Sequence, residues 1–353
     1  MSEKIPTPFQ ANYTPNLPEI LTKMDCSIAI STYQAGKIVF LSAASEERLV
    51  QLPRQFRRPM ALELKGNRLA ISTLDSVITF VNDSRLASNY PNQKDTYDSI
   101  FAPRVTYYTG RLDIHGIHWI NESIWFVNTS FSCISQISDY YSFEPVWKPP
   151  FITDLTPMDK CHLNSIAFND EGPLYASCLG KGDEKESWRD TLPKGGVLLH
   201  IPTNEIILHS LAMPHSLQIY DNELYMLLSA NGELIKVNPE KADYDVVRRF
   251  DGFVRGMAIF KDHAFVACSK LRKNSSTFRA LPIADRANTA GIVIIHLPSS
   301  AVVAQLNYES SVDEIYDIII LPGQKRPGII NTDGDTYKLA LTLPQTTYWA
   351  SPA

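Results

Sequence analysis

Four polar side chains that could bind or transform a ligand stand at equivalent places in a degenerate repeat. They are His115, Asn164, His215 and Arg255, and each lies where a short apolar run begins. Neutral imidazoles beside an amide suit zinc, iron or manganese, and such a metal would activate water or polarise a carbonyl. The alternative is that these histidines only hydrogen-bond the backbone of neighbouring segments. The residues alone leave both interpretations open.

Within this set, His115 and His215 are the candidate catalytic residues. His162, two residues before Asn164, joins them as the third candidate metal ligand. The chain has no HxH, HExxH or facial-triad spacing, so no sequence motif identifies a metal. The cofactor therefore stays open, with a divalent metal as the candidate. Cys133 is a further thiol without a clear histidine partner along the chain.

Arg255 predicts an anionic partner, because an unpaired buried charge is costly. Its planar guanidinium suits the carboxylate or phosphate of a ligand. An ion pair with Asp113, Glu314 or Asp317 explains the residue equally well. The other candidate ligand-binding residues are polar or aromatic positions of the same motifs: Gln34, Lys37, Asn128, Asn164 and Tyr316.

The repeat that positions these residues is clearest in Met213–Asn238, which reads MPHSLQIYDNELYMLLSANGELIKVN. Three short strands are separated there by an Asp-Asn turn and an Asn-Gly turn, and Asn-Gly between alternating apolar runs is a strong hairpin signal. The pattern recurs in five other places, at spacings of roughly 40–60 residues, which is typical of propeller blades. Alignment of the openings makes six residues equivalent: Met60, His115, Asn164, His215, Arg255 and Tyr316.

Six units of about four strands each predict an all-β fold, a six-bladed β-propeller. Ser27–Pro53 contains three strands but lacks an innermost one, and Tyr316–Leu321 near the C-terminus supplies it. We therefore expect N- and C-terminal strands to share a blade and close the ring, which removes open sheet edges. Residues 1–353 form one propeller domain in this interpretation, and residues 1–26 form an N-terminal surface segment.

Two insertions, 179–195 and 269–290, fall between the second and third strands of their units. In a propeller these connections emerge on the face where the chain enters each innermost strand. We therefore expect both insertions at the same channel mouth as the aligned residues. The loop Ser31–Lys37 falls on that face too, as a ligand-facing loop or as a plain turn. Four insertion residues could cover a pocket or a partner surface: Trp188, Arg189, Phe278 and Arg279.

Composition excludes several classes of protein. The formal net charge of −5 and a pI near 5.9 argue against nucleic-acid binding, which normally requires a basic stripe. No apolar run reaches the length of a membrane-spanning helix, and no signal peptide is recognisable at the N-terminus. Five scattered cysteines without a CxxC fit reduced thiols, so a cytoplasmic location is expected. GxSxG, Walker and GxGxxG motifs are absent from the sequence.

Nine motifs together resemble a bacterial family of conserved hypothetical proteins described as a domain of unknown function. They are STYQAGK, RPMAL, DIHGIHW, WFVNTSFSC, CHLN, GGVL, MPHS, RGMA and EIYD, and the resemblance covers approximately residues 12–323. It implies a cytoplasmic bacterial protein. The family's recurrent polar positions fall on Gln34, Lys37, His115, Asn128, His162, Asn164, His215 and Arg255.

The architecture is also similar to NHL and gluconolactonase-like six-bladed propellers. The latter hold a divalent metal with Glu, Asn and Asp, whereas this chain offers His, Asn, His and Arg, which argues against a lactonase.

The favoured function is a channel-mouth site that binds, and in an enzyme transforms, a small anionic ligand or peptide, with a metal as one alternative. The competing function is a non-catalytic propeller that binds a peptide or protein partner, and a purely structural role is the third.

Overall fold

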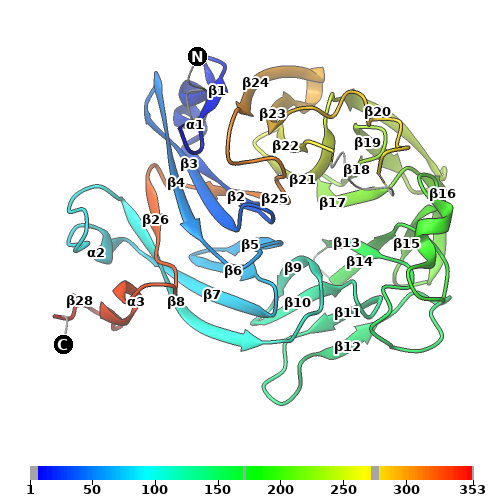
Figure 1. Ribbon diagram of the computed structural model, residues 1–353, viewed down its shortest axis with the longest axis horizontal. Coiled ribbons are helices and arrows are strands. Elements are labelled where there is room, and N and C mark those ends of the chain that lie inside the picture. The colour runs from blue at the N-terminus through cyan, green and yellow to red at the C-terminus, as the bar shows by residue number, and fades with distance from the viewer. Residues whose placement is uncertain (1–6, 170–171, 272–277, 352–353) are drawn as a thin grey trace, which may run out of the picture.

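Six β-sheets stand around a central axis in the computed structural model, which describes residues 7–169, 172–271 and 278–351 (Figure 1). The protein is therefore a six-bladed β-propeller, as the repeat predicts. The blade that closes the ring is made of β25 (Asp317–Pro322), β2 (Cys26–Thr32), β3 (Lys37–Ser45) and β4 (Arg48–Gln55). The next contains β5 (Leu62–Lys65), β6 (Arg68–Ser72), β7 (Ser76–Asp83) and β8 (Ser99–Tyr108).

The other four blades follow in chain order, each with its first strand innermost. The third blade has β9 (Ile114–Ile120), β10 (Ser123–Asn128), β11 (Cys133–Gln136) and β12 (Glu144–Trp147). The fourth has β13 (Leu163–Asn169), β14 (Gly172–Cys178), β15 (Gly196–His200) and β16 (Glu205–Leu211). The fifth has β17 (Pro214–Tyr220), β18 (Glu223–Leu228), β19 (Glu233–Asn238) and β20 (Asp243–Arg249). The sixth has β21 (Phe253–Phe260), β22 (His263–Ser269), β23 (Ala290–His296) and β24 (Ala301–Tyr308).

The predicted closure of the ring is confirmed. β25 pairs antiparallel with β2, so that Ile28 lies opposite Ile320 and Ser31 opposite Asp317. All seven residues of β2 are buried, because neighbouring blades cover both faces of this sheet. Apolar clusters form between adjacent blades rather than inside one, which is why no repeat could fold alone.

The two turns of the clearest repeat differ in geometry. Asp221 and Asn222 both have positive φ, at 49° and 61°, as a two-residue hairpin requires. At the Asn-Gly turn only Gly232 has positive φ, at 68°, and the chain needs a longer loop between β18 and β19. Both positions are hairpins, but only Asp-Asn makes the tight type.

The N-terminal segment does more than run over the surface. β1 (Ala11–Tyr13) adds a fifth strand to the sixth blade beside β24. α1 (Leu17–Met24) then buries Leu17, Leu21 and Met24 against the closing blade and its neighbour. The apolar spacing of these three residues explains why the predicted surface segment contains packed structure up to Met24.

The C-terminal residues extend the second blade. β26 (Pro327–Ile329) pairs in parallel with β8, and it is followed by α3 (Thr336–Leu339) and the hairpin of β27 (Ala340–Thr342) and β28 (Thr347–Trp349). This tail packs with α2 (Ser84–Ala87), in the lower left of Figure 1. Two short 3₁₀ segments complete the structure, η1 (Ser187–Thr191) and η2 (Leu297–Ser299). No helix in the described ranges is long and apolar enough to cross a membrane.

Candidate functional site

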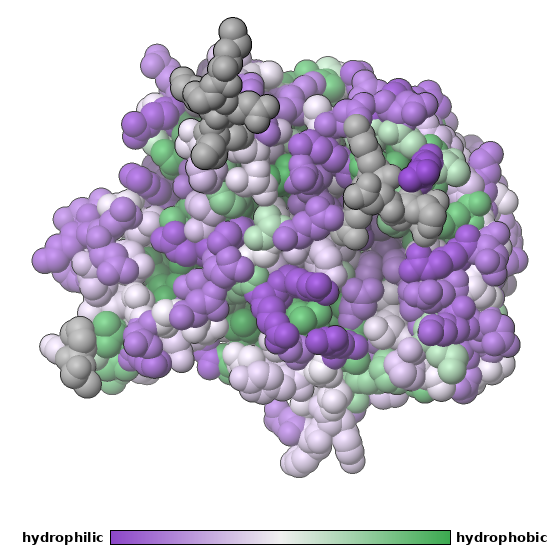
Figure 2. Space-filling view, viewed as in Figure 1, coloured by the Kyte–Doolittle hydropathy of each residue, from purple (hydrophilic) through white to green (hydrophobic). Residues whose placement is uncertain are grey.

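A cavity of about 550 Å³ opens at one mouth of the central channel. Its wall includes residues of both insertions, Trp188 and Arg189 from the first and Phe278 from the second. These three insertion residues therefore lie at the same channel mouth as the chain entries that line this cavity. Seen along the axis, the molecular surface is mainly hydrophilic with small apolar patches (Figure 2). Aromatic side chains concentrate inside the cavity instead: Trp188, Phe253, Phe278 and Tyr316.

Five of the six aligned residues surround the axis at the floor of this cavity. A second cavity of about 90 Å³ lies in the channel, and all five line it; four of them, all but Asn164, line the upper cavity too. We call this set the entry ring: His115, Asn164, His215, Arg255 and Tyr316. The structure thus brings together five of the aligned residues, each from a different blade.

Buried hydroxyl groups join five of the six blades to the next just behind the entry ring. Thr129 donates a hydrogen bond to the carbonyl of Leu163 at 2.7 Å, and Ser269 donates to that of Ile315 at 3.1 Å. Three further blades use the same device, and we call the five hydroxyls the hydroxyl clasps: Ser31, Ser72, Thr129, Ser229 and Ser269.

The clasps also correct the alignment at one position. Ser31 binds the carbonyl of Met60, whereas Thr129 binds that of Leu163, the residue before Asn164. The equivalent of the entry-ring residues is therefore Ala61 rather than Met60. Met60 lies one position earlier and lines the upper cavity.

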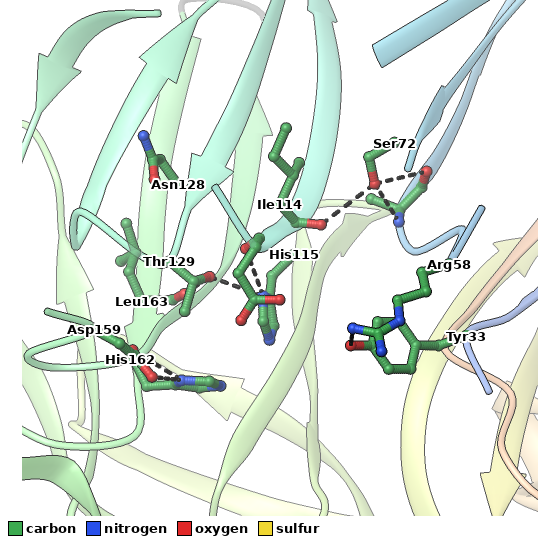
Figure 3. A network of polar contacts seen from close by, with 12 residues as sticks. Tyr33, Arg58, Ser72, Ile114, His115, Asn128, Thr129, Asp159, His162 and Leu163 are labelled. Atoms are coloured by element: carbon green, nitrogen blue, oxygen red, sulfur yellow. Dashed lines mark hydrogen bonds and ion pairs between the residues drawn. The ribbon is translucent and has the colours of Figure 1, made fainter. Parts of the chain in front are cut away.

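Two clasps hold the entry-ring histidines. Nδ1 of His115 lies 2.9 Å from the carbonyl oxygen of Asp113 and 2.9 Å from the hydroxyl of Thr129 (Figure 3). Nδ1 of His215 is placed in the same way, 3.1 Å from the carbonyl oxygen of Met213 and 2.8 Å from the hydroxyl of Ser229. Each imidazole thus has a carbonyl two residues before it and a hydroxyl fourteen residues after it.

These contacts determine which nitrogen carries the proton. A carbonyl oxygen can only accept, so Nδ1 of His115 and of His215 must donate, and Nε2 of the neutral imidazole keeps a lone pair. Burial lowers the pKa of His115 to about 4 and places that of His215 well below its usual value, with the nearby Arg255 adding to both effects. Near neutral pH both residues offer hydrogen-bond acceptors to the channel.

His162 is positioned by a carboxylate rather than by a clasp. Its Nδ1 lies 2.9 Å from Asp159, and Trp188 donates its indole N–H to the same carboxylate at 3.0 Å. The imidazole packs between Trp188, at a centroid distance of 4.4 Å, and His115, at 4.8 Å and nearly perpendicular. Figure 3 shows His115, at the start of β9, and His162, just before β13, close to each other.

Arg255 has its counter-ion inside the protein. Its guanidinium pairs with Glu314, a carboxylate that is only 6% exposed, and lies 4.5 Å over the ring of Tyr316. The other cations of the wall are paired too, Arg189 with Glu186 at 3.2 Å and Lys270 with Asp313 at 2.6 Å. The ion-pair explanation of Arg255 therefore holds, and the guanidinium does not require an anionic ligand.

Two hydrogen-bond donors of the entry ring are exceptions to this pairing. Nδ2 of Asn164 and Nε of Arg255 are buried and have no hydrogen-bond partner among the residues that the structure describes. Asn164 is only 3% exposed, and its side chain lines the channel cavity. Buried polar groups normally find partners, so each such donor requires an explanation.

Acidic groups line the channel below the entry ring. Burial raises the pKa of Glu63 to about 8, with a further contribution from Asp317, and raises that of Asp317 to about 7. Asp317 accepts hydrogen bonds from the backbone N–H groups of Leu62 and Ile318, which makes it a link between two blades. His118, 4.0 Å from Glu63, has a pKa lowered by burial to about 4.

The predicted metal centre has no support from this geometry. Across residues 7–169, 172–271 and 278–351, no group of three or more His, Cys, Asp or Glu side chains is arranged to hold a metal ion. His115, His162 and His215 all line the upper cavity, and because each Nδ1 contacts a protein acceptor, only Nε2 of each imidazole is left for another partner.

Three predicted ligand-binding residues lie outside both cavities. Asn128 is fully buried, bonded to Ser135 and to the backbone of Phe131, and Figure 3 shows its amide turned away from the imidazoles. Lys37 pairs with Gln55, and Gln34 is an exposed residue of the same loop. Gln34 lies in the turn before β3 and Lys37 is the first residue of that strand, whereas Tyr33 of the same loop lines the cavity. The buried thiol of Cys133 has a pKa raised to about 11, which excludes a reactive thiolate.

The sequence reasoning missed Asp159 and Phe253. Asp159 stands three residues before His162 in a Pro-rich crossover, and its spacing to that histidine was the available signal. Phe253 lies at the start of an apolar strand, where nothing in the sequence separates a cavity wall from a core residue.

Comparison with known proteins agrees with this architecture. The family model described as Domain of unknown function (DUF4915) matches residues 15–330. A chain in a crystal structure of a nidogen/laminin complex is similar in fold, with a TM-score of 0.54 and 13% sequence identity, over 85% of this chain and 99% of that one. A search of curated proteins gives no match.

Proposed function

We propose that this chain, which belongs to the DUF4915 family, binds a small polar organic molecule without net charge at the mouth of its propeller channel. One observation carries the proposal: the cations of the cavity wall are paired within the protein, while Asn164 and Arg255, which line the channel cavity, each keep a donor without a partner among the described residues. A charged ligand would therefore meet no counter-ion that is not already paired. This proposal replaces the expected anionic ligand.

The walls of the cavity support a ligand that is partly apolar. Trp188, Phe253 and Phe278 provide aromatic surface above the polar entry ring. Small-molecule sites commonly combine such apolar walls with a few polar groups that fix orientation. A volume of about 550 Å³ lies within the usual range for these sites.

Binding is tested by differential scanning fluorimetry with neutral, anionic and cationic fragments of matched size. A neutral ligand at a hundred times its dissociation constant should stabilise the fold by about 2.7 kcal/mol. The variant Phe253→Ala should weaken this stabilisation, and Lys37→Ala, on the same face but outside the cavity, should leave it unchanged. Stabilisation by anions alone would contradict the proposal.

General-base catalysis is the second candidate, favoured by the Asp159–His162 pair. A carboxylate that accepts from Nδ1 orients an imidazole and supports proton uptake at Nε2. The variant Asp159→Asn separates the two functions. An enzyme would lose turnover of the bound compound, whereas a binding protein would show no conversion of that compound in either form, as followed by NMR.

A protein partner is the alternative carried over from the fold. The similar chain comes from a complex of nidogen with laminin, and that assembly is a property of those proteins. For this chain the concave, aromatic-lined cavity favours a small molecule over a protein surface.

A further inference from the structure

The hydrogen-bonding groups of the entry ring form an ordered pattern. In chain order the consecutive blades present Nε2 of His115 as acceptor, Nδ2 of Asn164 as donor, and Nε2 of His215 as acceptor. The next blade presents Nε of Arg255 as a second donor. All four residues line the lower cavity, so two donors and two acceptors belong to the side chains around it.

We infer that the entry ring recognises an uncharged group that both donates and accepts hydrogen bonds, such as a primary carboxamide. A carboxylate could satisfy Asn164 and Arg255 but would place lone pairs against those of His115 and His215. An ammonium group would satisfy the imidazoles and leave both donors without an acceptor. A carboxamide supplies an oxygen acceptor and an N–H donor together.

The geometry of the channel agrees with a ligand of this kind. The lower cavity of about 90 Å³ holds more than one water molecule, which is enough for a terminal carboxamide. The bulk of the ligand would then remain in the upper cavity against Trp188 and Phe253. The low pKa of His115 supports the same conclusion, because protonation to suit an anion is unfavourable there.

Polar discrimination of this type is strong when the protein groups are buried. A ligand that leaves a buried donor or acceptor without a partner loses about 1–3 kcal/mol, or about one to two orders of magnitude in affinity. This inference rests on the proposed function, since it names the chemical group that the same cavity would bind.

Four benzene derivatives of nearly equal size test the inference. Benzamide donates and accepts, acetophenone only accepts, benzoate is anionic, and benzylamine is cationic. Dissociation constants at millimolar ligand concentrations are measured by ¹⁵N-histidine NMR, which also reports whether the ligand contacts the imidazoles. We expect benzamide to bind at least about tenfold more tightly than benzoate and benzylamine, and several-fold more tightly than acetophenone.

Two variants locate the effect. Asn164→Leu should weaken benzamide binding about tenfold, because it removes a donor, whereas Lys37→Ala should not change it. Equal binding of benzamide and acetophenone would overturn the inference while leaving the proposed function intact. A preference for benzoate, or no binding of any of the four compounds, would contradict both.

Discussion

The hydroxyl clasps and the entry ring are two neighbouring sets of buried polar groups that differ in whether their hydrogen bonds are made within the protein. Every clasp hydroxyl donates to a carbonyl of the next blade, as Thr129 does to Leu163. The entry ring instead retains donors on Asn164 and Arg255 that nothing in the described part of the chain accepts. The first set holds the propeller closed, and the second leaves hydrogen-bonding capacity for something outside the chain.

The two sets meet at the histidines. The hydroxyls of Thr129 and Ser229 contact Nδ1 of His115 and His215, so two clasps fix the orientation of the entry-ring histidines. The polar groups that have partners within the protein therefore explain stability, and in the proposed function those without partners serve binding. The predictions below separate these two roles.

Acidification should cause the largest change in the free energy of unfolding, because it protonates His115. Its pKa is about 4 in the folded protein and about 6.5 in the unfolded chain, so its contribution is complete above pH 6.5 and is lost as the pH falls toward 4. The loss amounts to about 3 kcal/mol at about 1.4 kcal/mol per unit. Urea unfolding of the wild type and of His115→Asn, which keeps a donor but cannot titrate, should give curves that converge below pH 6.5. Curves that stay parallel from pH 8 to 4 would contradict this account.

Removal of one clasp hydroxyl should lower the free energy of unfolding somewhat less than acidification does. Ser229→Ala leaves the buried carbonyl of Val254 without its donor and removes a contact from His215. We expect the free energy of unfolding to fall by about 2 kcal/mol. Ser45→Ala provides the matched control, because Ser45 is exposed, and it should change stability by less than about 0.5 kcal/mol. Equal effects of the two substitutions would show that the clasps do not hold the blades together.

The entry ring should tolerate the loss of a donor. Asn164→Leu removes a buried donor and keeps a similar volume, so stability should rise or change by less than about 1 kcal/mol. Ligand stabilisation should fall by about 1.4 kcal/mol in the same variant, which corresponds to the tenfold weaker binding. Should this substitution destabilise the protein as much as Ser229→Ala does, Asn164 would belong to the structural set.

The propeller and its closure were predictable because the repeat carries them. Turn residues and apolar runs recur in each unit, and Tyr316–Leu321 supplied the innermost strand that Ser27–Pro53 lacks. The entry ring followed from the same alignment, because topology alone places equivalent residues around the axis. Only Met60 was misplaced, by one residue.

The chemistry of the site was less predictable, because it depends on which atoms are already paired. The sequence offered Arg255 three carboxylates and could not choose Glu314 among them. It also could not reveal that Asn128 is fixed by Ser135 while Asn164, a similar motif residue, is not bonded through its amide nitrogen to any described group. Partners on another strand or another blade decide these cases.

The tautomers of His115 and His215 test the central claim most directly. Selective ¹⁵N labelling of the eight histidines, with long-range ¹H–¹⁵N correlation and His→Asn variants for assignment, distinguishes a protonated Nδ1 from a protonated Nε2. We predict that both residues are neutral at pH 7 with the proton on Nδ1, and that His115 remains so down to about pH 5. A proton on Nε2, or titration of His115 near pH 6.5, would contradict the account.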